Sequence, residues 1–259
     1  MTSLQAERIH EPNFVLLHGF GTSSRVWRHV AEDLAGARPL HPDLPGFGSC
    51  ADQSGYSVRE MADAVQGDIE KAGLARFVLV GHSMGGKVAL DLAARRPEGL
   101  AGLVLIAPSP PTPEPMTDED REKLKAAYGN EEALRALYER ITRRELEPLD
   151  WENLIQDGLR ASQAAWDAWP DSGSREDISG EVGGIDVPTL VIASRDDPVM
   201  ALGMIEREVV DRLKGAQLDV LSGVGHLLPL EAPRDVTRHL LHWARTALYQ
   251  EITGGEATG

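Results

Sequence analysis

A serine between closely spaced glycines is the first candidate for chemistry, in the motif Gly81-His82-Ser83-Met84-Gly85. The motif follows an apolar run over residues 77–80 and precedes a segment of helical periodicity, which predicts a tight turn from strand to helix. Glycines two residues before and two after the serine leave room for the chain to approach itself closely. The turn lifts the hydroxyl clear of the sheet edge and places it at the positive end of the following helix. We therefore predict that Ser83 is a nucleophile.

A histidine and a carboxylate are needed to activate such a serine, because its hydroxyl is a weak nucleophile until an oriented base removes the proton. Among eight histidines, His226 is the candidate base, since it follows the apolar run 217–221 in a glycine-containing loop. That loop lies at the expected carboxyl end of a strand, where a doubly wound sheet carries its site. Asp196 and Asp197 follow the run 189–194, and either could reach the histidine; we favour Asp197.

The same turn also satisfies part of a phosphate-binding loop, because Gly86 and Lys87 complete the pattern GxxxxGK. That loop requires a hydroxyl residue after the lysine to ligate magnesium, and Val88 stands there instead. The formal net charge of −15 also disfavours the binding of ATP. We therefore reject a phosphate-binding loop and expect Lys87 on the exposed side of the helix.

Short apolar runs, separated by longer amphipathic segments, must position these residues. Runs too short for helices predict strands over residues 14–18, 77–81, 100–107, 189–194 and 217–221, with a weaker run over 37–43. Segments of helical periodicity lie over residues 24–35, 58–72, 84–95, 202–213 and 233–247. This alternation predicts an α/β fold with a doubly wound, mostly parallel sheet covered by helices.

The alternation breaks over residues 112–180, where only helix-type sequence occurs between a proline-rich start and a Gly/Ser/Asp-rich end. This stretch holds 17 acidic and 9 basic residues, a balance of −8. Trp151, Trp166 and Trp169 lie in it and either pack onto the core or line a substrate pocket under a lid. We predict a core in two parts, a helical cap inserted between them and a disordered polar tail. The predicted ranges are 1–111 and 185–249 for the core, 112–184 for the cap and 250–259 for the tail.

Composition restricts the partners and the location of the protein. With 26 basic against 41 acidic side chains, the chain repels phosphate backbones and anionic lipids, so we expect neither nucleic acid nor a membrane as a partner. The single cysteine, Cys50, excludes an internal disulfide and a CxxC metal or redox site. The N-terminus lacks a basic segment followed by an apolar one, so we expect no signal peptide and a cytoplasmic location. A monomer or a homodimer is expected.

Five motifs together resemble the α/β-hydrolase superfamily along nearly the whole chain. They are His18-Gly19-Phe20-Gly21, DLPGFG at 43–48, GHSMGG at 81–86, Asp-Asp-Pro at 196–198 and Gly225-His226. The resemblance implies a triad of Ser83, Asp197 and His226, because the family's acid directly precedes the proline. It also implies an oxyanion hole formed by the backbone N–H groups of Phe20 and Met84. Relatives often have a hairpin before the first strand, where this chain has few residues, so we expect about six to eight strands.

The resemblance further implies a serine hydrolase that cleaves a carboxylic ester or a lactone through an acyl-enzyme on Ser83, with no metal and no organic cofactor. The tryptophans and low basic content of the predicted cap favour a small, uncharged, moderately apolar substrate. Relatives with the same triad include carbon–carbon bond hydrolases, cofactor-free haloperoxidases or perhydrolases and hydroxynitrile lyases. These alternatives stay open, as does a non-catalytic small-molecule receptor, because a fold does not fix a function.

Overall fold

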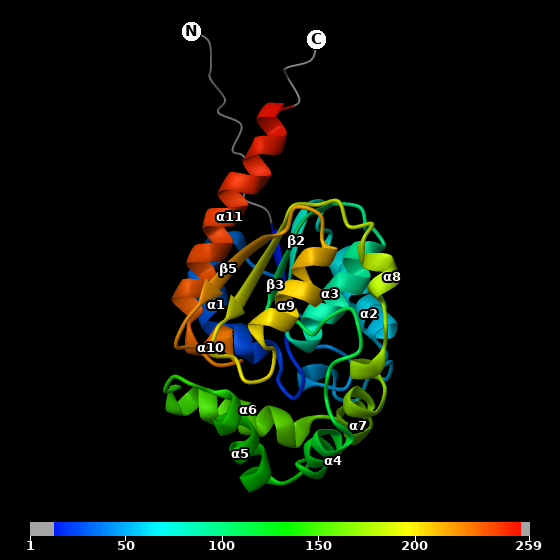
Figure 1. Cartoon of the computed structure of the whole chain (residues 1–259), viewed down its shortest axis with the longest axis vertical. Helices are drawn as coiled ribbons and strands as arrows, with labels where there is room; N and C mark the ends of the chain where they lie inside the picture. Colours follow the sequence, from blue (N-terminus) through cyan, green and yellow to red (C-terminus); the bar gives the residue numbers. More distant parts are fainter. Residues whose placement is uncertain (1–12, 255–259) are drawn as a thin grey trace.

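The computed structural model of the protein describes residues 13–254. A single parallel sheet forms the centre of the molecule (Figure 1). Its strands are β1 (Asn13–Leu17), β2 (Phe77–His82), β3 (Leu100–Ile106), β4 (Thr189–Ser194) and β5 (Gln217–Leu221). They lie side by side in the order β1-β2-β3-β4-β5, and every neighbouring pair is parallel. The central strands β2, β3 and β4 are buried almost throughout, which explains their uninterrupted apolar sequences. The predicted α/β fold with a parallel sheet is confirmed.

The sheet has five strands among the described residues, fewer than the six to eight predicted. The weak run over residues 37–43 forms only an isolated bridge, in which the Leu40 N–H donates to the Phe14 carbonyl and the Leu40 carbonyl accepts from the Leu16 N–H, both at 2.8 Å. Pro39 and Pro42 flank this bridge. Pro42 has no N–H to donate to β1, and Arg38, the next paired position on the other side, lies in the left-handed region with φ 45°, so the pairing ends on both sides of Leu40.

Helices cover both faces of the sheet. In Figure 1, α1 (Arg28–Asp33) and α11 (Pro233–Gly254) lie on one face, and α2 (Val58–Ala72) and α3 (Met84–Ala94) lie on the other. A capping box between Ser57 and Glu60 begins α2, and Gly73 in the left-handed region ends it. Helix α11 continues through residues 250–254, so the first half of the predicted disordered tail is helical; residues 255–259 lie outside the described range.

Four helices lie beyond the carboxyl ends of the strands, at the end of the molecule away from α11 (Figure 1). They are α4 (Asp118–Ala126), α5 (Glu131–Ile141), α6 (Pro148–Arg160) and α7 (Gln163–Asp171). Side chains of Thr117, Asn130 and Ser162 accept backbone N–H hydrogen bonds at the starts of α4, α5 and α7. We call residues 112–184, which hold these helices, the cap segment; its boundaries stay a prediction.

Shorter helices connect the main elements. The α-helical ones are α8 (Ser179–Val182), α9 (Leu202–Glu208) and α10 (Leu228–Glu231). The 3₁₀ turns are η1 (Ser24–Trp27), η2 (Ala35–Ala37), η3 (Gly48–Cys50), η4 (Gly173–Arg175) and η5 (Val210–Arg212). No described helix is long and apolar enough to cross a bilayer.

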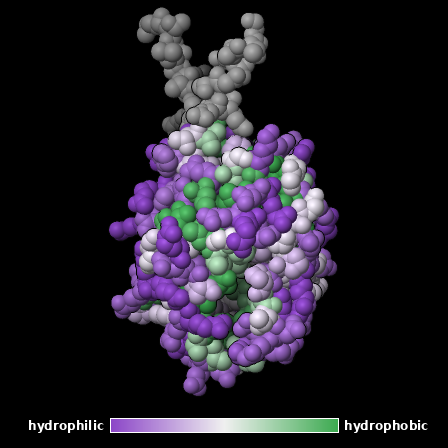
Figure 2. Space-filling model, in the orientation of Figure 1, coloured by the Kyte–Doolittle hydropathy of each residue, from purple (hydrophilic) through white to green (hydrophobic). Residues whose placement is uncertain are grey.

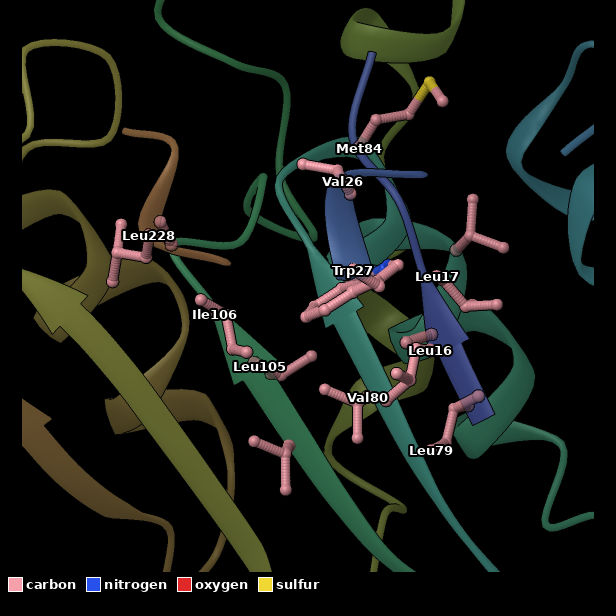
Figure 3. Packing of buried hydrophobic residues seen from close by; sticks show 14 of the residues in the cluster. Leu16, Leu17, Val26, Trp27, Leu79, Val80, Met84, Leu105, Ile106 and Leu228 are labelled. Atoms are coloured by element: carbon pink, nitrogen blue, oxygen red, sulfur yellow. The ribbon is translucent and has the colours of Figure 1, made fainter. Parts of the chain in front are cut away.

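The core lies between the sheet and the helices that cover it. Figure 3 shows leucine, isoleucine and valine side chains of β1, β2 and β3 packed together near Trp27 of η1. Trp27 is completely buried. Polar side chains cover most of the face seen in Figure 2. The packed sheet therefore holds the carboxyl ends of its strands rigidly under the cap segment.

Candidate active site

The turn between β2 and α3 holds Ser83 in a backbone conformation that L-residues rarely adopt, with φ 51° and ψ −120°. Two neighbouring glycines are required sterically for this turn. A Cβ on Gly81 would lie 2.3 Å from the Gly85 carbonyl oxygen, and a Cβ on Gly85 would lie 2.5 Å from the His18 carbonyl oxygen. The closeness of these backbone atoms explains the glycine spacing in the sequence. Strain of this kind is characteristic of functional sites, since the surrounding packing must hold it.

Three side chains meet at the carboxyl ends of β2, β4 and β5. The Ser83 Oγ lies 2.9 Å from Nε2 of His226, and Nδ1 of the same ring lies 2.8 Å from Oδ2 of Asp197. The other Asp197 oxygen accepts the backbone N–H groups of Val199, at 2.7 Å, and Met200, at 3.0 Å. With the carboxylate accepting from Nδ1–H, the Nε2 lone pair faces the serine hydroxyl, as a general base requires. The structure brings together all three predicted residues.

The neighbouring carboxylate, Asp196, points elsewhere. Its Oδ2 accepts the Gly223 N–H at 2.6 Å, and the side chain is exposed. The geometry therefore separates the two aspartates that the sequence left as alternatives: Asp197 contacts the histidine, and Asp196 connects the loop after β4 to the loop after β5.

Asp197 and His226 shift each other's pKa values in opposite directions. Burial raises the pKa of Asp197, but the His226 ring and the two backbone N–H groups lower it more, so this pKa lies below its ordinary value. Burial lowers the pKa of His226, but Asp197 raises it more, so this pKa lies above its ordinary value. As a consequence, Asp197 is ionised and the His226 imidazole gains a proton readily.

The predicted oxyanion donors lie on either side of the serine. Phe20 follows β1, Met84 begins α3, and neither backbone N–H has a hydrogen-bond partner in the part of the chain that the structure describes. The loop carrying Phe20 is fixed by His18, whose Nδ1 lies 2.9 Å from the Gly19 carbonyl and whose Nε2 accepts the Leu44 N–H at 3.0 Å. Burial lowers the pKa of His18, which suits the neutral ring that these two bonds need.

A cavity of about 360 Å³ opens above Ser83 and His226. Its wall includes Phe20, Glu114, Met116, Leu124, Tyr138, Trp166, Trp169 and Met200. The rings of Phe20 and Trp166 lie 4.6 Å apart between centroids, so they pack as a pair in this wall. Most of these residues belong to the cap segment, which therefore supplies much of the apolar surface of the cavity.

Two of the three predicted pocket tryptophans line this cavity, and the third does not. Trp166 and Trp169 of α7 are buried in its wall. The prediction for Trp151 is wrong, because this residue lies on α6 with its ring under the Arg135 guanidinium, 5.7 Å from the ring centroid. The guanidinium covers the ring through a cation–π contact on the outer part of the α5–α6 pair.

The prediction of an exposed Lys87 is also wrong. Helix α3 is buried along most of its length between the sheet and its neighbours, and Lys87 has no exposed surface. Its Nζ donates to the carbonyls of Thr112 and Glu176, near the two ends of the cap segment. Burial lowers the pKa of Lys87 to about 8.

A buried glutamate that the sequence analysis missed organises the loop of the histidine. Glu231 accepts the backbone N–H groups of Gly225 at 2.8 Å and Leu227 at 3.0 Å, one on each side of His226. It also accepts the backbone N–H groups of Arg143 at 2.7 Å and Arg144 at 2.9 Å, which belong to the cap segment. The Glu231 carboxylate thus connects the loop of His226 to the cap segment through hydrogen bonds.

A further hydrogen bond strengthens this connection. The His226 N–H donates to the carbonyl of Ile141 at 2.8 Å. The signal in the sequence was a single acid, Glu231, inside the apolar stretch 227–233. Charged residues are rarely buried unless paired or hydrogen bonded, so an acid in such a stretch indicates a specific partner.

A cluster of potential metal ligands lies away from this cavity. His29, Glu147 and Asp150 bring their ligand atoms within 4.8 Å of one another. The Arg28 guanidinium binds both carboxylates, at 2.5 Å and 2.6 Å, so a positive charge already lies between the two acids. We interpret it as an ion-pair network between η1–α1 and the start of α6.

Parts of the sequence are similar to curated proteins. A segment of 112 residues is 38% identical to the pimeloyl-[acyl-carrier protein] methyl ester esterase of Aeromonas salmonicida, and covers 42% of each chain. A segment of 94 residues is 36% identical to the 2-succinyl-6-hydroxy-2,4-cyclohexadiene-1-carboxylate synthase of Enterobacter sp., and covers 36% of each. These matches span less than half the length of either curated relative.

Solved structures and the family match extend over most of the chain. A thermophilic esterase from Thermogutta terrifontis is similar with a TM-score of 0.70 and 26% identity, over 91% of this chain and 90% of that one. Residues 14–239, from β1 to within α11, match the alpha/beta hydrolase family. This range contains the serine turn, both acids and the histidine loop, and the chain therefore belongs to the alpha/beta hydrolase family.

Proposed function

We propose that the protein is a serine hydrolase that cleaves a carboxylic ester or lactone through an acyl-enzyme on Ser83. The observation that carries this proposal is the hydrogen-bonded series from Asp197 through His226 to Ser83, at 2.8 Å and 2.9 Å, at the floor of a cavity. Similarity to an esterase of pimeloyl-[acyl-carrier protein] methyl ester supports the same chemistry.

In the proposed mechanism, Nε2 of His226 accepts the Ser83 hydroxyl proton while Oγ attacks the ester carbonyl. The N–H groups of Phe20 and Met84 stabilise the negative charge on the carbonyl oxygen. His226 then gives its proton to the leaving alcohol, and the same ring activates water to cleave the acyl-enzyme. Asp197 stays ionised throughout and stabilises the imidazolium.

The proposed substrate is small, uncharged and moderately apolar. The cavity volume of about 360 Å³ is near the lower end of the range typical of small-molecule sites. Aromatic rings and methionines form much of its wall, while the charged side chains among its lining residues are few: Glu114, Asp120 and Arg140. We also propose that the cap segment is the lid of this site, since it contributes most of the wall.

Hydrolysis of a p-nitrophenyl ester series from acetate to dodecanoate, by the parent and by Ser83→Ala, tests the proposal. We expect turnover by the parent that peaks at short or medium acyl chains, and none by the variant, with equal thermal stability of the two. Equal activity of parent and variant would refute the mechanism. A folded parent without turnover on any chain length would direct attention to a carbon–carbon bond hydrolase, a perhydrolase, a lyase or a receptor.

A further inference from the structure

One polar group in the wall of the cavity has no role in the mechanism above. Glu114, in the cap segment, lines the cavity and is only 7% exposed. Its backbone N–H donates to the Ser174 carbonyl at 2.8 Å, and the one side-chain donor that acts on its carboxyl among the described residues is the Ser109 hydroxyl. The Ser109 hydroxyl is itself buried and has no other partner among those residues.

Two other buried polar groups in this wall already have hydrogen-bond partners. The Tyr138 hydroxyl donates to the Gly21 carbonyl at 2.7 Å, and Nε1 of Trp166 donates to the Leu124 carbonyl at 2.8 Å. A carboxylate can accept about four hydrogen bonds, so a nearly buried one with a single donor beside it keeps acceptor positions that a ligand in the cavity can fill. Small-molecule sites typically fix the orientation of a ligand with a few such groups in an apolar wall.

The charges around Glu114 decide which ligand group it prefers. Lys87 and Arg121 both act on its carboxyl electrostatically, although their nitrogen atoms donate to other groups. Lys87 donates to the carbonyls of Thr112 and Glu176, and Arg121 donates to the Pro170 carbonyl and the Ser174 hydroxyl. Two positive charges nearby leave little attraction for a cationic ligand. Burial raises the pKa of Glu114, while the hydrogen bond from Ser109 and the charges of Lys87, His226 and Arg121 oppose this shift. A hydroxyl suits the site in either protonation state, because it both donates and accepts a hydrogen bond.

We propose that Glu114 is a substrate-recognition residue that hydrogen bonds to a hydroxyl group of the ester or lactone, so that hydroxylated substrates are preferred over their deoxy counterparts. This inference rests on the proposed ester hydrolysis and names its substrate class. A site built to hydrogen bond a hydroxyl discriminates against an analogue without it, because the buried group of the site is then left unpaired.

Matched substrate pairs test the inference with the full chain. On the acyl side, p-nitrophenyl butanoate is compared with p-nitrophenyl 2-hydroxybutanoate and 3-hydroxybutanoate; on the alcohol side, ethyl butanoate is compared with 2-hydroxyethyl butanoate. We expect the parent to favour at least one hydroxylated ester by about tenfold or more in kcat/KM, the ratio that one hydrogen bond to a charged group supports. Glu114→Leu is expected to reduce that ratio to about one, and Glu114→Gln to an intermediate value, since its amide still pairs with a hydroxyl.

The same substitutions on the surface of α5, Glu132→Leu and Glu132→Gln, are the matched controls, because Glu132 is exposed and outside the cavity wall. We expect both controls to keep the parent's ratio. A parent that shows no preference in any pair overturns the inference without any variant, even where Ser83→Ala has established ester hydrolysis. A preference that survives in Glu114→Leu also overturns it. If the parent hydrolyses no ester at all, the proposed function and this inference fall together.

Discussion

Replacing Glu231 with glutamine would remove one charge from the junction between the base and the cap segment. The carboxylate accepts four backbone N–H groups, three on Oε2 and one on Oε1. In Glu231→Gln the amide oxygen can serve only one of these two positions. The NH₂ group, which has only donors, then faces a backbone N–H at the other position. The variant therefore keeps the shape of the side chain while breaking part of its network.

The loss of stability in Glu231→Gln can be calculated from the hydrogen bonds that the carboxylate accepts. If the amide oxygen keeps the three donors on Oε2, the Leu227 N–H loses its acceptor, which costs about 1–3 kcal/mol in a buried site. The three remaining bonds become neutral ones, which are about half as strong as charge-assisted bonds. We expect a total loss of about 3–5 kcal/mol in the free energy of unfolding. For a chain of this size, such a loss lowers the melting temperature by about 6 °C or more.

Activity should fall further than stability explains. The two N–H groups that Glu231 holds flank His226, so the ring moves relative to Ser83, and a misplacement of about 1 Å costs about 10²-fold in rate. The negative charge of Glu231 also raises the pKa of His226, together with Asp197 and Glu114, whereas burial lowers it. Its removal should therefore move the acid limb of the kcat/KM profile to lower pH.

Melting temperature, kcat/KM and the pH profile are measured for the parent, Glu231→Gln and the control Glu208→Gln. Glu208 carries the same change on a side chain whose carboxylate pairs with Arg212 at 2.7 Å near the surface. Exposed pairs of this kind contribute about 0–1 kcal/mol, so the control should resemble the parent. If Glu231→Gln loses less than about 1 kcal/mol of stability and keeps the parent's pH profile, the reasoning about the carboxylate is refuted.

Three other substitutions or conditions give direct tests. Asp197→Asn should lower kcat about 10³–10⁴-fold by disturbing the histidine tautomer, while Asp196→Asn stays within a few-fold of the parent; the reverse order in steady-state assays would mean that the acid is misassigned. In the parent, kcat/KM should fall as the pH drops through the raised pKa of His226, above its ordinary 6.5, because a protonated ring cannot accept the serine proton; a profile flat down to pH 5 would contradict this. Lys87→Met should lower the free energy of unfolding by about 2–4 kcal/mol, since the Thr112 and Glu176 carbonyls lose their donor; an unchanged urea midpoint would show that water replaces it.

The proximity of Ser83, Asp197 and His226 could be predicted from the sequence because each lies within a few residues of the carboxyl end of a strand. A parallel sheet brings the carboxyl ends of its strands to one edge, so residues that follow β2, β4 and β5 must lie near one another. The glycines around Ser83 also mark its turn locally, through contacts of backbone with backbone. Ser83 and His226 thus needed only the strand positions and the pattern of the turn, whereas the choice of Asp197 over Asp196 needed the proline after it.

Residues whose roles depend on packing could not be found in the same way. Trp151 and Trp166 lie in similar helical sequence, and only the arrangement of α5, α6 and α7 decides which ring reaches the cavity. The strand expected over 37–43 is limited to one bridge at Leu40, and Pro42 within that run already restricted the pairing on one side. Apolar periodicity alone therefore overestimated the sheet.

Lys87 shows why helical periodicity in the sequence does not predict the burial of polar residues on α3. A helical pattern assumes that one face meets water, but α3 lies between the sheet and the helices α2 and α8, so its polar residues must find partners inside the protein. The ammonium of Lys87 finds them in the carbonyls of Thr112 and Glu176, close to where the chain leaves the core and returns to it. A buried cation with carbonyl partners is costly to separate from them. The helix that begins after Ser83 therefore also holds the cap segment near both of its ends, which fixes the position of the cavity wall relative to Ser83.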